Sequence, residues 1–353
     1  FAAGSHLIYP QFATHNAHTI AAVYQIAQGG PFEFQRLHGM GSDLYAEVIG
    51  PKQFDVPCRV YAPVGSHEDL LPYLVRRLLE NGANTSFVNR VVDEATPARD
   101  LVADPCDTVR AFDSIPHPRI PLPANLYGEL RKNSMGVNFA NDNELTALAE
   151  AVNACTGPWT AGPLVPGAAS QGAMVEVTNP ADRRQRVGSY LSADDATVQQ
   201  ALANAHAAQD RWNTMPVSNR AAMLEYAAEQ LEARRAEFIA LCVREAGKSL
   251  PDAIAEIREA ADFLRYYATM ARRLFAEPEV LPGPTGESNR LYLEGRGVFV
   301  GISPWNFPLA IFVGQVSAAL AAGNPVIAKP AEQTSLIGYL ATRLLHEAGV
   351  PED

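Results

Sequence analysis

The sequence predicts an α/β fold, because strands and helices alternate in two separate regions of the chain. Three short apolar segments in residues 1–90 are each followed by a helical pattern, and the same alternation returns in residues 297–353. Consecutive strand–helix units are typical of a parallel sheet covered by helices. The length of 353 residues fits two or more domains.

The first region is predicted to cover residues 1–92 and to contain three strand–helix units. The strands are expected at residues 7–13, 32–37 and 58–62, and the helices at 18–28, 42–49 and 68–80. Ser42 is a candidate N-cap, and Asn81-Gly82 is expected to stop the last helix. The order fits part of a (β/α)8 barrel or of a doubly wound sheet. In both folds functional residues gather where the strands end.

A connector is expected over residues 93–171, where prolines recur and a short helix is predicted at 143–154. The second unit, residues 172–353, is predicted to begin with a strand at 174–178 and a turn at Asn179-Pro180. Three long helices are then expected at 193–212, 218–246 and 251–275.

Two further strand–helix pairs close the second unit. A buried strand is predicted at 297–303 and a second strand at 325–329, with their helices at 308–322 and 336–348. Gly323 and Gly349 are expected to end these helices, as glycine often does at helix C-termini. This order is the opening of a Rossmann-like sheet.

The composition argues against some partners and against a membrane-spanning segment. Asp and Glu number 39 against 28 Lys and Arg, a net charge of -11, which makes the chain a poor generic binder of nucleic acid or anionic lipid. No run of 18 apolar residues predicts a transmembrane helix, and no signal-peptide pattern is present. Because the sequence opens at Phe1 inside a folded pattern, we expect it to be a fragment of a longer protein.

The four cysteines show no C-x-x-C spacing, so the sequence contains neither a zinc nor a redox motif of that kind. Their small number fits a reducing cytosol. Cys242 lies within a helical pattern and is expected to be a packed, unreactive thiol.

One helix of the first region carries two adjacent arginines. The stripe at i, i+3, i+4 and i+7 consists of Tyr73, Arg76, Arg77 and Glu80. The apolar side chains of the opposite face are Leu71, Leu74, Val75 and Leu78. Two guanidiniums side by side suit a carboxylate. The alternative is a solvated face in which Arg76 pairs with Glu80.

Polar residues also follow the predicted strands. Thr14, His15 and Asn16 come after the first strand, and Gln35 lies on the second. At the functional edge of a parallel sheet these side chains could hydrogen-bond a cofactor ring or a phosphate; alternatively, they cap helices or close turns. The Gly39-Met40-Gly41 loop adds little, since G-x-G occurs by chance.

Four longer segments carry a resemblance to a known family. They are ATHNAHT (13–19), FEFQRLHGMG (32–41), RVYAPVG (59–65) and YLVRRLLENGANTSFVNR (73–90). They resemble the closing part of the proline dehydrogenase domain of bacterial proline utilization A. The resemblance implies a (β/α)8 barrel that holds FAD, with Arg76 and Arg77 clamping the carboxylate of proline. The other residues that it implies for the substrate pocket are Leu37, Tyr61 and Tyr73, and those for flavin contacts are Thr14, His15, Asn16, Gln35 and Glu80.

The two late strands of the second unit are followed by polar residues as well. They lie in the segments GVFVGISPWNFPL (297–309) and VIAKPAEQT (326–334). Asn306 offers a neutral amide donor at a strand end, where an oxyanion donor is expected. Lys329 and Glu332 can bond the hydroxyls of a ribose. The alternatives are a helix cap for Asn306 and a surface charge for Lys329.

Both segments resemble the cofactor-binding domain of the aldehyde dehydrogenase superfamily, and the match extends from about residue 172 to residue 353 through the helical EAGKSLPDAIAEIREAADFLRYYA (245–268). The resemblance implies that Asn306 stabilises the oxyanion of a thiohemiacetal. The residues that it implies for binding NAD are Ile302, Ser303, Pro304, Trp305, Lys329 and Glu332. Glu332 would favour NAD over NADP. The superfamily's catalytic cysteine and general-base glutamate lie downstream of the Lys329-Pro330-x-Glu332 motif, so Cys242 is not expected to be the nucleophile.

The segment RKNSMGVNFAND (131–142) resembles the joint between the two catalytic domains of proline utilization A. Together the matches predict bifunctional proline catabolism: FAD-dependent oxidation of proline to pyrroline-5-carboxylate, then NAD-dependent oxidation of glutamate semialdehyde to glutamate. In this family the flavin electrons pass to a membrane quinone. We therefore expect a cytoplasmic protein that is peripheral at the inner membrane. A homo-oligomer is expected as well. Contact with nucleic acid is expected only if an N-terminal DNA-binding module exists.

Two alternatives stay open at this stage. The earlier barrel strands and the downstream catalytic residues are not in this sequence, so we expect incomplete active sites. The sequence could then be a non-catalytic scaffold or interaction segment. It could also be a single-function aldehyde dehydrogenase with an unrelated N-terminal extension.

Overall fold

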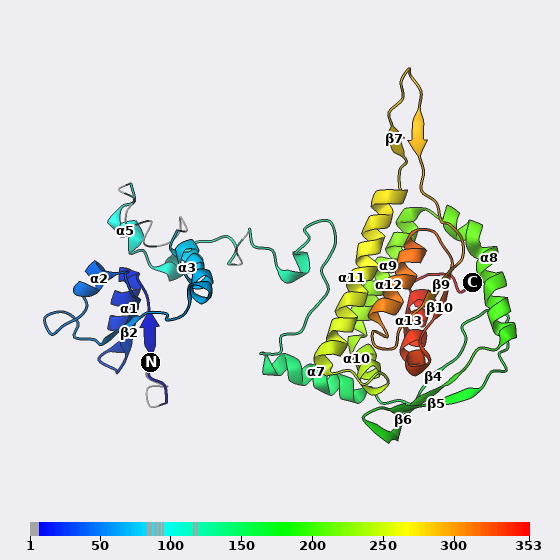
Figure 1. Cartoon of the computed structure of the whole chain (residues 1–353), viewed down its shortest axis with the longest axis horizontal. Coiled ribbons are helices and arrows are strands. Elements are labelled where there is room, and N and C mark those ends of the chain that lie inside the picture. Colours follow the sequence, from blue (N-terminus) through cyan, green and yellow to red (C-terminus); the bar gives the residue numbers. More distant parts are fainter. Residues whose placement is uncertain are drawn as a thin grey trace. The chain divides into compact units, whose positions relative to one another are not determined.

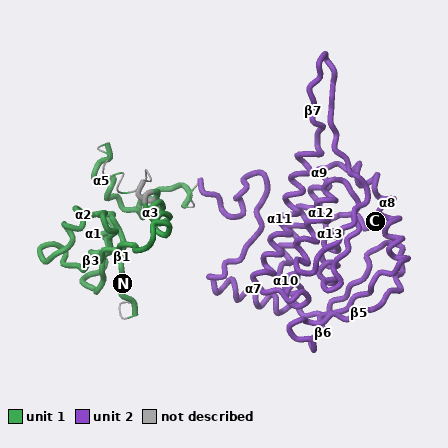
Figure 2. Tube along the Cα trace, viewed as in Figure 1, with its two compact units in different colours: residues 1–117 green, residues 118–353 purple. Residues whose placement is uncertain are grey.

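The structure is a computed structural model that describes residues 7–82, 87, 90, 93, 95–115, 117 and 119–353 (Figure 1). It divides into two compact units, residues 1–117 and 118–353 (Figure 2). The predicted connector, residues 93–171, is therefore shared between the two units. Within the described ranges, no helix is both long and apolar enough to cross a membrane.

Unit 1 is built from three parallel strands, each followed by a helix. The strands pair in the order β1 (Gln11–Ala13), β2 (Glu33–Leu37) and β3 (Cys58–Tyr61). The helices that follow them are α1 (Ala17–Ala27), α2 (Ser42–Ala46) and α3 (His67–Gly82). Two short helices come later, α5 (Ala98–Leu101) and α6 (Pro105–Arg110). The three predicted strand–helix units are all present.

The two faces of this sheet differ in chemistry. Phe12, Phe34 and Cys58 are partners across the three strands, and Phe34 is fully buried in a core that includes Ile20 of α1 and Tyr45 of α2. Side chains alternate along a strand, so the neighbours of these residues point to the other face. The residues of that second face are Gln11, Ala13, Glu33, Gln35, Leu37, Arg59 and Tyr61. The face opposite α1 and α2 is therefore mainly polar.

Three predicted helix boundaries in unit 1 are wrong. The helix expected at 42–49 ends at Ala46 as α2. The N-cap of α2 is Gly41, and Ser42 is the first helical residue. Gly41 takes a left-handed conformation with φ 66°, and an added Cβ would lie 2.8 Å from the ring of His15, so this turn requires glycine. Helix α3 continues through Asn81 and Gly82, because a glycine's penalty of about 1 kcal/mol is too small to end a well-formed helix by itself.

Unit 2, over its described residues, combines a helical layer with three small sheets. It contains η1 (Pro123–Asn125), α7 (Asp142–Ala154), α8 (Asp195–Thr214), α9 (Val217–Ala233), α10 (Arg235–Arg244) and α11 (Leu250–Phe275). One sheet has the order β4 (Trp159–Ala161), β6 (Asp182–Leu191), β5 (Met174–Asn179). The hairpin of β7 (Glu279–Leu281) and β8 (Asn289–Leu291) extends from α11 as a narrow ribbon (Figure 1).

The last part of unit 2 is a parallel strand–helix repeat. Strand β9 (Phe299–Ile302) pairs in parallel with β10 (Val326–Lys329). Helix α12 (Ala310–Ala321) connects them, and η2 (Glu332–Thr334) and α13 (Ser335–Glu347) follow β10. Helix α11 packs against both α9 and α12, and fully buried alanines such as Ala227, Ala228 and Ala261 let these helices approach closely.

Several predictions for unit 2 are confirmed and others are corrected. Gly323 and Gly349 follow the ends of α12 and α13 with φ of 90° and 104°, as predicted. The single helix expected at 218–246 is broken at Arg234, whose guanidinium binds Glu237 and the distant Glu347. Strand β9 is not buried, since Ile302 is 67% exposed. Strand β6 and the β7–β8 hairpin were not predicted.

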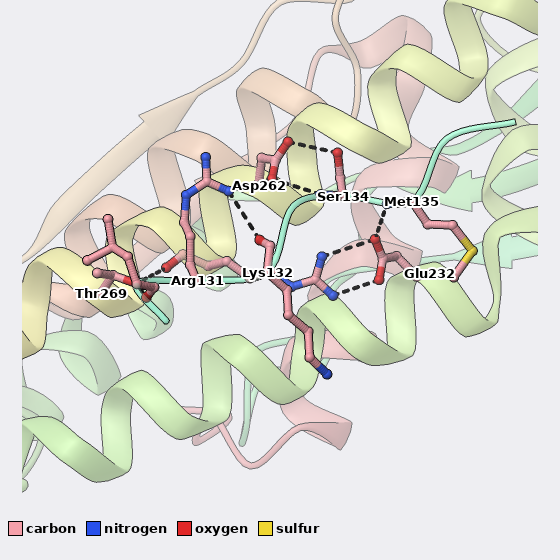
Figure 3. A network of polar contacts seen from close by, with 9 residues as sticks. Arg131, Lys132, Ser134, Met135, Glu232, Asp262 and Thr269 are labelled. Carbon is pink, nitrogen blue, oxygen red and sulfur yellow. Dashed lines mark hydrogen bonds and ion pairs between the residues drawn. The ribbon is translucent and has the colours of Figure 1, made fainter. Parts of the chain in front are cut away.

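The joint segment is fixed to the helical layer by two carboxylates (Figure 3). Asp262 on α11 accepts hydrogen bonds from Arg131 Nη1 (2.7 Å), from Ser134 Oγ (2.7 Å) and from the Ser134 backbone N–H (3.1 Å). Glu232 on α9 accepts from the backbone N–H of Met135 (2.7 Å) and pairs with Arg265 of α11. Each carboxylate therefore ties the irregular segment to a helix by charge-assisted hydrogen bonds.

We expect Asp262→Ala to destabilise unit 2 by about 1–3 kcal/mol, because it leaves the buried N–H and O–H of Ser134 without an acceptor. Urea unfolding followed by tryptophan fluorescence measures this unit alone, because all 3 tryptophans lie within it. Glu259→Ala, on an exposed face of the same helix, should change the unfolding free energy by less than about 0.5 kcal/mol. Equal effects of the two substitutions would contradict the assignment.

Candidate active sites

The predicted flavin residues of unit 1 lie together at the carboxyl ends of β1 and β2. Thr14, His15 and Asn16 follow β1, and Gln35 lies on β2, paired with Ala13 of β1 and Arg59 of β3. The hydroxyl of Tyr45, on α2, contacts the backbone oxygens of Thr14 at 2.7 Å and Gln35 at 3.1 Å. This buried tyrosine therefore holds the ends of β1 and β2 at one level.

His15 is held as a neutral imidazole with a defined tautomer. Its Nε2 accepts the backbone N–H of Leu37 at 3.3 Å, so the ring proton must be on Nδ1. Burial, and then the positive charge of Arg36, lower the pKa of His15. Gly41 leaves room for the ring, since a Cβ there would be 2.8 Å from it. Within the Gly39-Met40-Gly41 loop, Gly41 thus has a steric function, whereas a Cβ at Gly39 would meet nothing within 4 Å.

Asn16 and Thr14 serve both local structure and the strand end. Asn16 Oδ1 accepts from the backbone N–H groups of His18 (2.9 Å) and Thr19 (3.3 Å), which makes Asn16 the N-cap of α1. Thr14 Oγ1 accepts the N–H of Asn16 at 3.1 Å. The capping alternative is therefore true for Asn16. Three neutral donors still remain at this strand end: the hydroxyl of Thr14, the Nδ1–H of His15 and the Nδ2 group of Asn16. Such donors fit the oxygens of a flavin cofactor.

The two adjacent arginines of α3 differ in exposure: Arg77 is half-buried and Arg76 is exposed. The Tyr73 ring lies 6.1 Å from the Tyr61 ring at the end of β3, and the guanidinium of half-buried Arg77 lies 5.4 Å from Tyr73. Arg76 is exposed, and so are Leu71, Leu74 and Val75 on the opposite face. The structure therefore brings Tyr61, Tyr73 and Arg77 together. The side chain of Glu80 lies outside the part of the chain that is described.

In unit 2 the two predicted strand ends are adjacent. Ile302 is the register partner of Lys329, and the N–H of Ser303 donates to the Lys329 carbonyl at 3.1 Å. The Lys329 ammonium and the Glu332 carboxylate are 3.0 Å apart, and this contact lowers the pKa of Glu332. Both residues also line a cavity of about 560 Å³ beside β10. A cationic donor next to an anionic acceptor fits the hydroxyls of a nucleotide ribose, as NAD would present them.

The loop from Ser303 to Leu309 is held by hydrogen bonds to a glutamate of α11. Glu256 Oε2 accepts the backbone N–H groups of Leu309 (3.1 Å) and Ala310 (2.8 Å) at the start of α12. Lys248 lies 2.6 Å from Glu256 Oε1 and 4.5 Å from the centre of the Phe307 ring. Because Glu256 caps α12, Asn306 has no capping role, and its side chain is exposed on the loop. Trp305 and Pro304 lie on the same loop.

A second buried glutamate accepts the backbone N–H groups at the start of α13. Glu245 accepts the N–H groups of Leu336 (2.7 Å) and Ile337 (2.9 Å) through its two oxygens. Burial raises the pKa of Glu245 to about 7, although these two hydrogen bonds oppose the rise. Sequence reasoning missed both glutamates. The available signal was a carboxylate placed among the apolar positions of a helical pattern. Cys242, also in this layer, is fully buried as predicted.

Two family models match the chain in succession. The model for proline dehydrogenase matches residues 2–90, and the model for the aldehyde dehydrogenase family matches residues 168–353. The second match covers more than half of the sequence, so the chain belongs to the aldehyde dehydrogenase family. Over nearly its whole length the chain is similar to the bifunctional protein PutA of Klebsiella aerogenes, at 50% identity over 359 residues, which is 98% of this chain and 26% of that protein.

Solved structures agree with these matches. A crystal structure of a Bradyrhizobium japonicum proline utilization A mutant is 49% identical with a TM-score of 0.75, and the match covers 99% of this chain and 33% of that one. A 1-pyrroline-5-carboxylate dehydrogenase from Thermus with bound NAD is 33% identical with a TM-score of 0.56, over 62% of this chain and 43% of its own. The chain spans about a quarter of the length of the curated relatives it matches.

The comparisons confirm the resemblance to proline utilization A and the predicted fold class. The three strand–helix units of unit 1 lie in the match to proline dehydrogenase, and the β9–α12–β10–α13 repeat lies in the match to aldehyde dehydrogenase. The match over residues 2–90 argues against an unrelated N-terminal extension. The roles of the individual site residues stay predictions.

Titration of Glu245 should make unit 2 less stable as the pH rises. Its pKa is about 7 in the folded chain against an ordinary value of 4.5, so the folded chain binds more protons within this window. The unfolding free energy should therefore fall between about pH 4.5 and 7, by at most about 3 kcal/mol, and level off above the folded pKa. Urea unfolding at several pH values should show a shallower decline for Glu245→Gln. Glu150→Gln, at an exposed position of α7, should leave the dependence of the unfolding free energy on pH as in the wild type. The same dependence in all three proteins would contradict the raised pKa of Glu245.

Proposed function

We propose that this chain is the central part of a bifunctional enzyme of proline catabolism. Unit 1 belongs to an FAD-dependent proline dehydrogenase that forms pyrroline-5-carboxylate, which hydrolyses to glutamate semialdehyde. The second unit belongs to an NAD-dependent dehydrogenase that oxidises this aldehyde to glutamate. The observation that carries the proposal is the gathering of both predicted residue sets at strand ends of two separate parallel sheets, in a chain similar to bifunctional PutA across 98% of its length.

The polar face of the first sheet supports binding of the flavin and of proline. Thr14, His15 and Asn16 would donate to cofactor oxygens, and Gln35 and Glu80 would complete the flavin contacts. FAD, when bound, supplies the acceptor for the hydride that leaves proline. Proline has no leaving group, so the protein's task is to hold the ring of the amino acid in a reactive position.

The α3 helix supports the recognition of proline. Arg77 lies against Tyr73 and Tyr61 at the end of β3, and Arg76 is one residue away on the same helix. A pair of guanidiniums binds a carboxylate through parallel hydrogen bonds and so fixes its orientation. Leu37, the register partner of Tyr61, would line the apolar side of the proline ring.

The rim of the second sheet supports binding of NAD and activation of the aldehyde. Lys329 and Glu332 would bond the ribose hydroxyls, and residues 302–305 would follow the nucleotide along the end of β9. The exposed amide of Asn306 would donate to the developing oxyanion of the thiohemiacetal formed by the family's downstream cysteine. Glu256 and Lys248 hold the loop that carries this asparagine.

The remaining parts of the proposal concern partners and place in the cell. The flavin electrons would pass to a membrane quinone, which fits a cytoplasmic protein that contacts the inner membrane peripherally. The protein would also be a homo-oligomer. Nucleic acid would be a partner only through a further N-terminal module. The competing candidate is a non-catalytic scaffold, for which neither flavin reduction by proline nor NAD reduction is expected.

Flavin absorbance and NAD reduction, measured with proline on the full-length protein, test the two activities together. We expect proline to bleach the flavin band and, when an electron acceptor is present, to produce NADH. A full-length protein that binds no flavin, or whose flavin proline does not reduce, would contradict the proline dehydrogenase assignment.

Loss of either guanidinium should weaken proline binding selectively. We expect Arg76→Ala and Arg77→Ala to raise the KM for proline roughly 10- to 100-fold, because each removes a charge-assisted hydrogen bond to the carboxylate. The NAD-dependent step, assayed with glutamate semialdehyde, should keep its wild-type rate. Arg99→Ala, on an exposed short helix, serves as the matched control. Unchanged proline turnover in both variants would refute the clamp.

Removal of the proposed oxyanion donor should affect the second activity alone. We expect Asn306→Ala to lower kcat for the aldehyde about 100- to 1,000-fold with little change in the KM for NAD. Asn306→Asp keeps the side-chain size but supplies no donor when ionised, and it should be as slow. A kcat within threefold of wild type for both variants would rule out this role.

A further inference from the structure

The polar face of unit 1 contains a buried carboxylate that the proposed chemistry leaves without a role. Glu33 on β2 is 3% exposed. Its Oε1 accepts from Gln11 Nε2 at 2.8 Å and from Gln35 Nε2 at 3.3 Å, and Arg59 forms a two-point contact at 2.7 and 2.8 Å. Side chains from all three strands therefore converge on one carboxylate.

We propose that Glu33 is a positioning residue: it fixes the side-chain amide of Gln35 with its nitrogen toward the carboxylate, so that Gln35 Oε1 serves as the acceptor for the ring N–H of the flavin. The inference rests on the flavin-binding part of the proposed function. To that proposed function it adds two details: the flavin-binding atom of Gln35 is Oε1, and Glu33 is the residue that turns this atom toward the ligand.

The charge of Glu33 determines which end of the amide faces it. The Arg59 contact, more than any other, lowers the pKa of Glu33, so the group is ionised at neutral pH. An ionised carboxylate only accepts hydrogen bonds, and the two ends of an amide differ in that only the nitrogen donates. Reversing the Gln35 amide would place two oxygens against each other. The orientation is thus imposed by charge.

The location of Gln35 makes this orientation relevant to a ligand. Gln35 lies on the face opposite α1 and α2, two residues before Leu37, and its own backbone oxygen is held by the hydroxyl of Tyr45. Both the backbone and the amide nitrogen of Gln35 are therefore held by protein groups. Among the described residues no donor contacts Oε1, so this atom is the part of the side chain left for a ligand.

The flavin ring supplies the matching group. Oxidised isoalloxazine has one ring N–H, at N3, and carbonyl or ring-nitrogen acceptors elsewhere. An acceptor held in advance binds this N–H without loss of side-chain freedom. The donors of Thr14, His15 and Asn16 would serve the acceptor atoms of the cofactor, so the rim presents both kinds of partner.

A double-mutant cycle on the full-length protein tests whether Glu33 acts through Gln35. We expect Glu33→Gln to weaken FAD binding roughly fivefold to tenfold, because the carboxamide no longer selects one orientation of its neighbour. In the Gln35→Leu background the same substitution should change the Kd for FAD by less than twofold. The midpoint potential of the flavin should shift in Glu33→Gln and not in Glu47→Gln, which removes an exposed carboxylate of the same unit.

The outcomes separate this inference from the function on which it rests. If the wild-type protein binds no FAD, the proposed function fails and the inference fails with it. If FAD binds but Glu33→Gln has the same effect with and without Gln35, Glu33 only stabilises the sheet, and the inference alone is overturned.

A second measurement applies if Glu33→Gln does not fold. Wild type and Gln35→Met are compared with FAD and with FAD methylated at N3, which has no N–H to donate. We expect Gln35→Met to weaken binding of FAD roughly fivefold to tenfold and to leave binding of the methylated analogue unchanged within twofold. Equal losses for both ligands would show that Gln35 does not accept from N3 and would overturn the proposal.

Discussion

Parallel strand pairing is the constraint on which both candidate sites depend. The register places Gln35 beside Ala13 and Arg59 in unit 1, and Ile302 beside Lys329 in unit 2. Because parallel strands all end at the same edge, residues separated by more than 20 positions in the sequence meet there. A slip of one residue in either pairing would turn the polar side chains of the strand to the opposite face.

Buried carboxylates then hold helix starts and side chains next to these strand ends in place. Glu245 and Glu256 each accept two backbone N–H groups at the start of α13 and α12, where the helix dipole also favours negative charge. Glu33 accepts four side-chain N–H contacts in unit 1. In each case a charge removed from water is compensated by several donors, so the surrounding loop or side chain has one preferred position. The three glutamates thus hold the segments that carry the proposed ligand contacts.

Sequence periodicity predicted most elements but not all of them. Strands β2, β3, β9 and β10 were found within two residues of their bounds, because apolar runs closed by glycine or polar turns are strong local signals. Strand β6 was missed, since DRRQRVGSYL has too few apolar residues to indicate a strand without its partner β5. The break at Arg234 was missed because it depends on the distant Glu347. Exposure of Ile302 was also not predictable, because burial depends on what packs over a strand.

The sequence by itself determined the identity of the strand-end residues, the two glycine-ended helices and the order of the regions that match proline dehydrogenase and aldehyde dehydrogenase. These features depend on local pattern and on long motif matches. Tertiary structure decided which of these residues have a partner. It showed that Asn16 caps α1 while Asn306 is exposed on its loop, that Arg77 lies against Tyr73 while Arg76 is exposed, and that the Glu33 carboxylate accepts from the Gln35 amide. Hydrogen bonds and burial join residues far apart in the chain, so no local pattern of residues contains them.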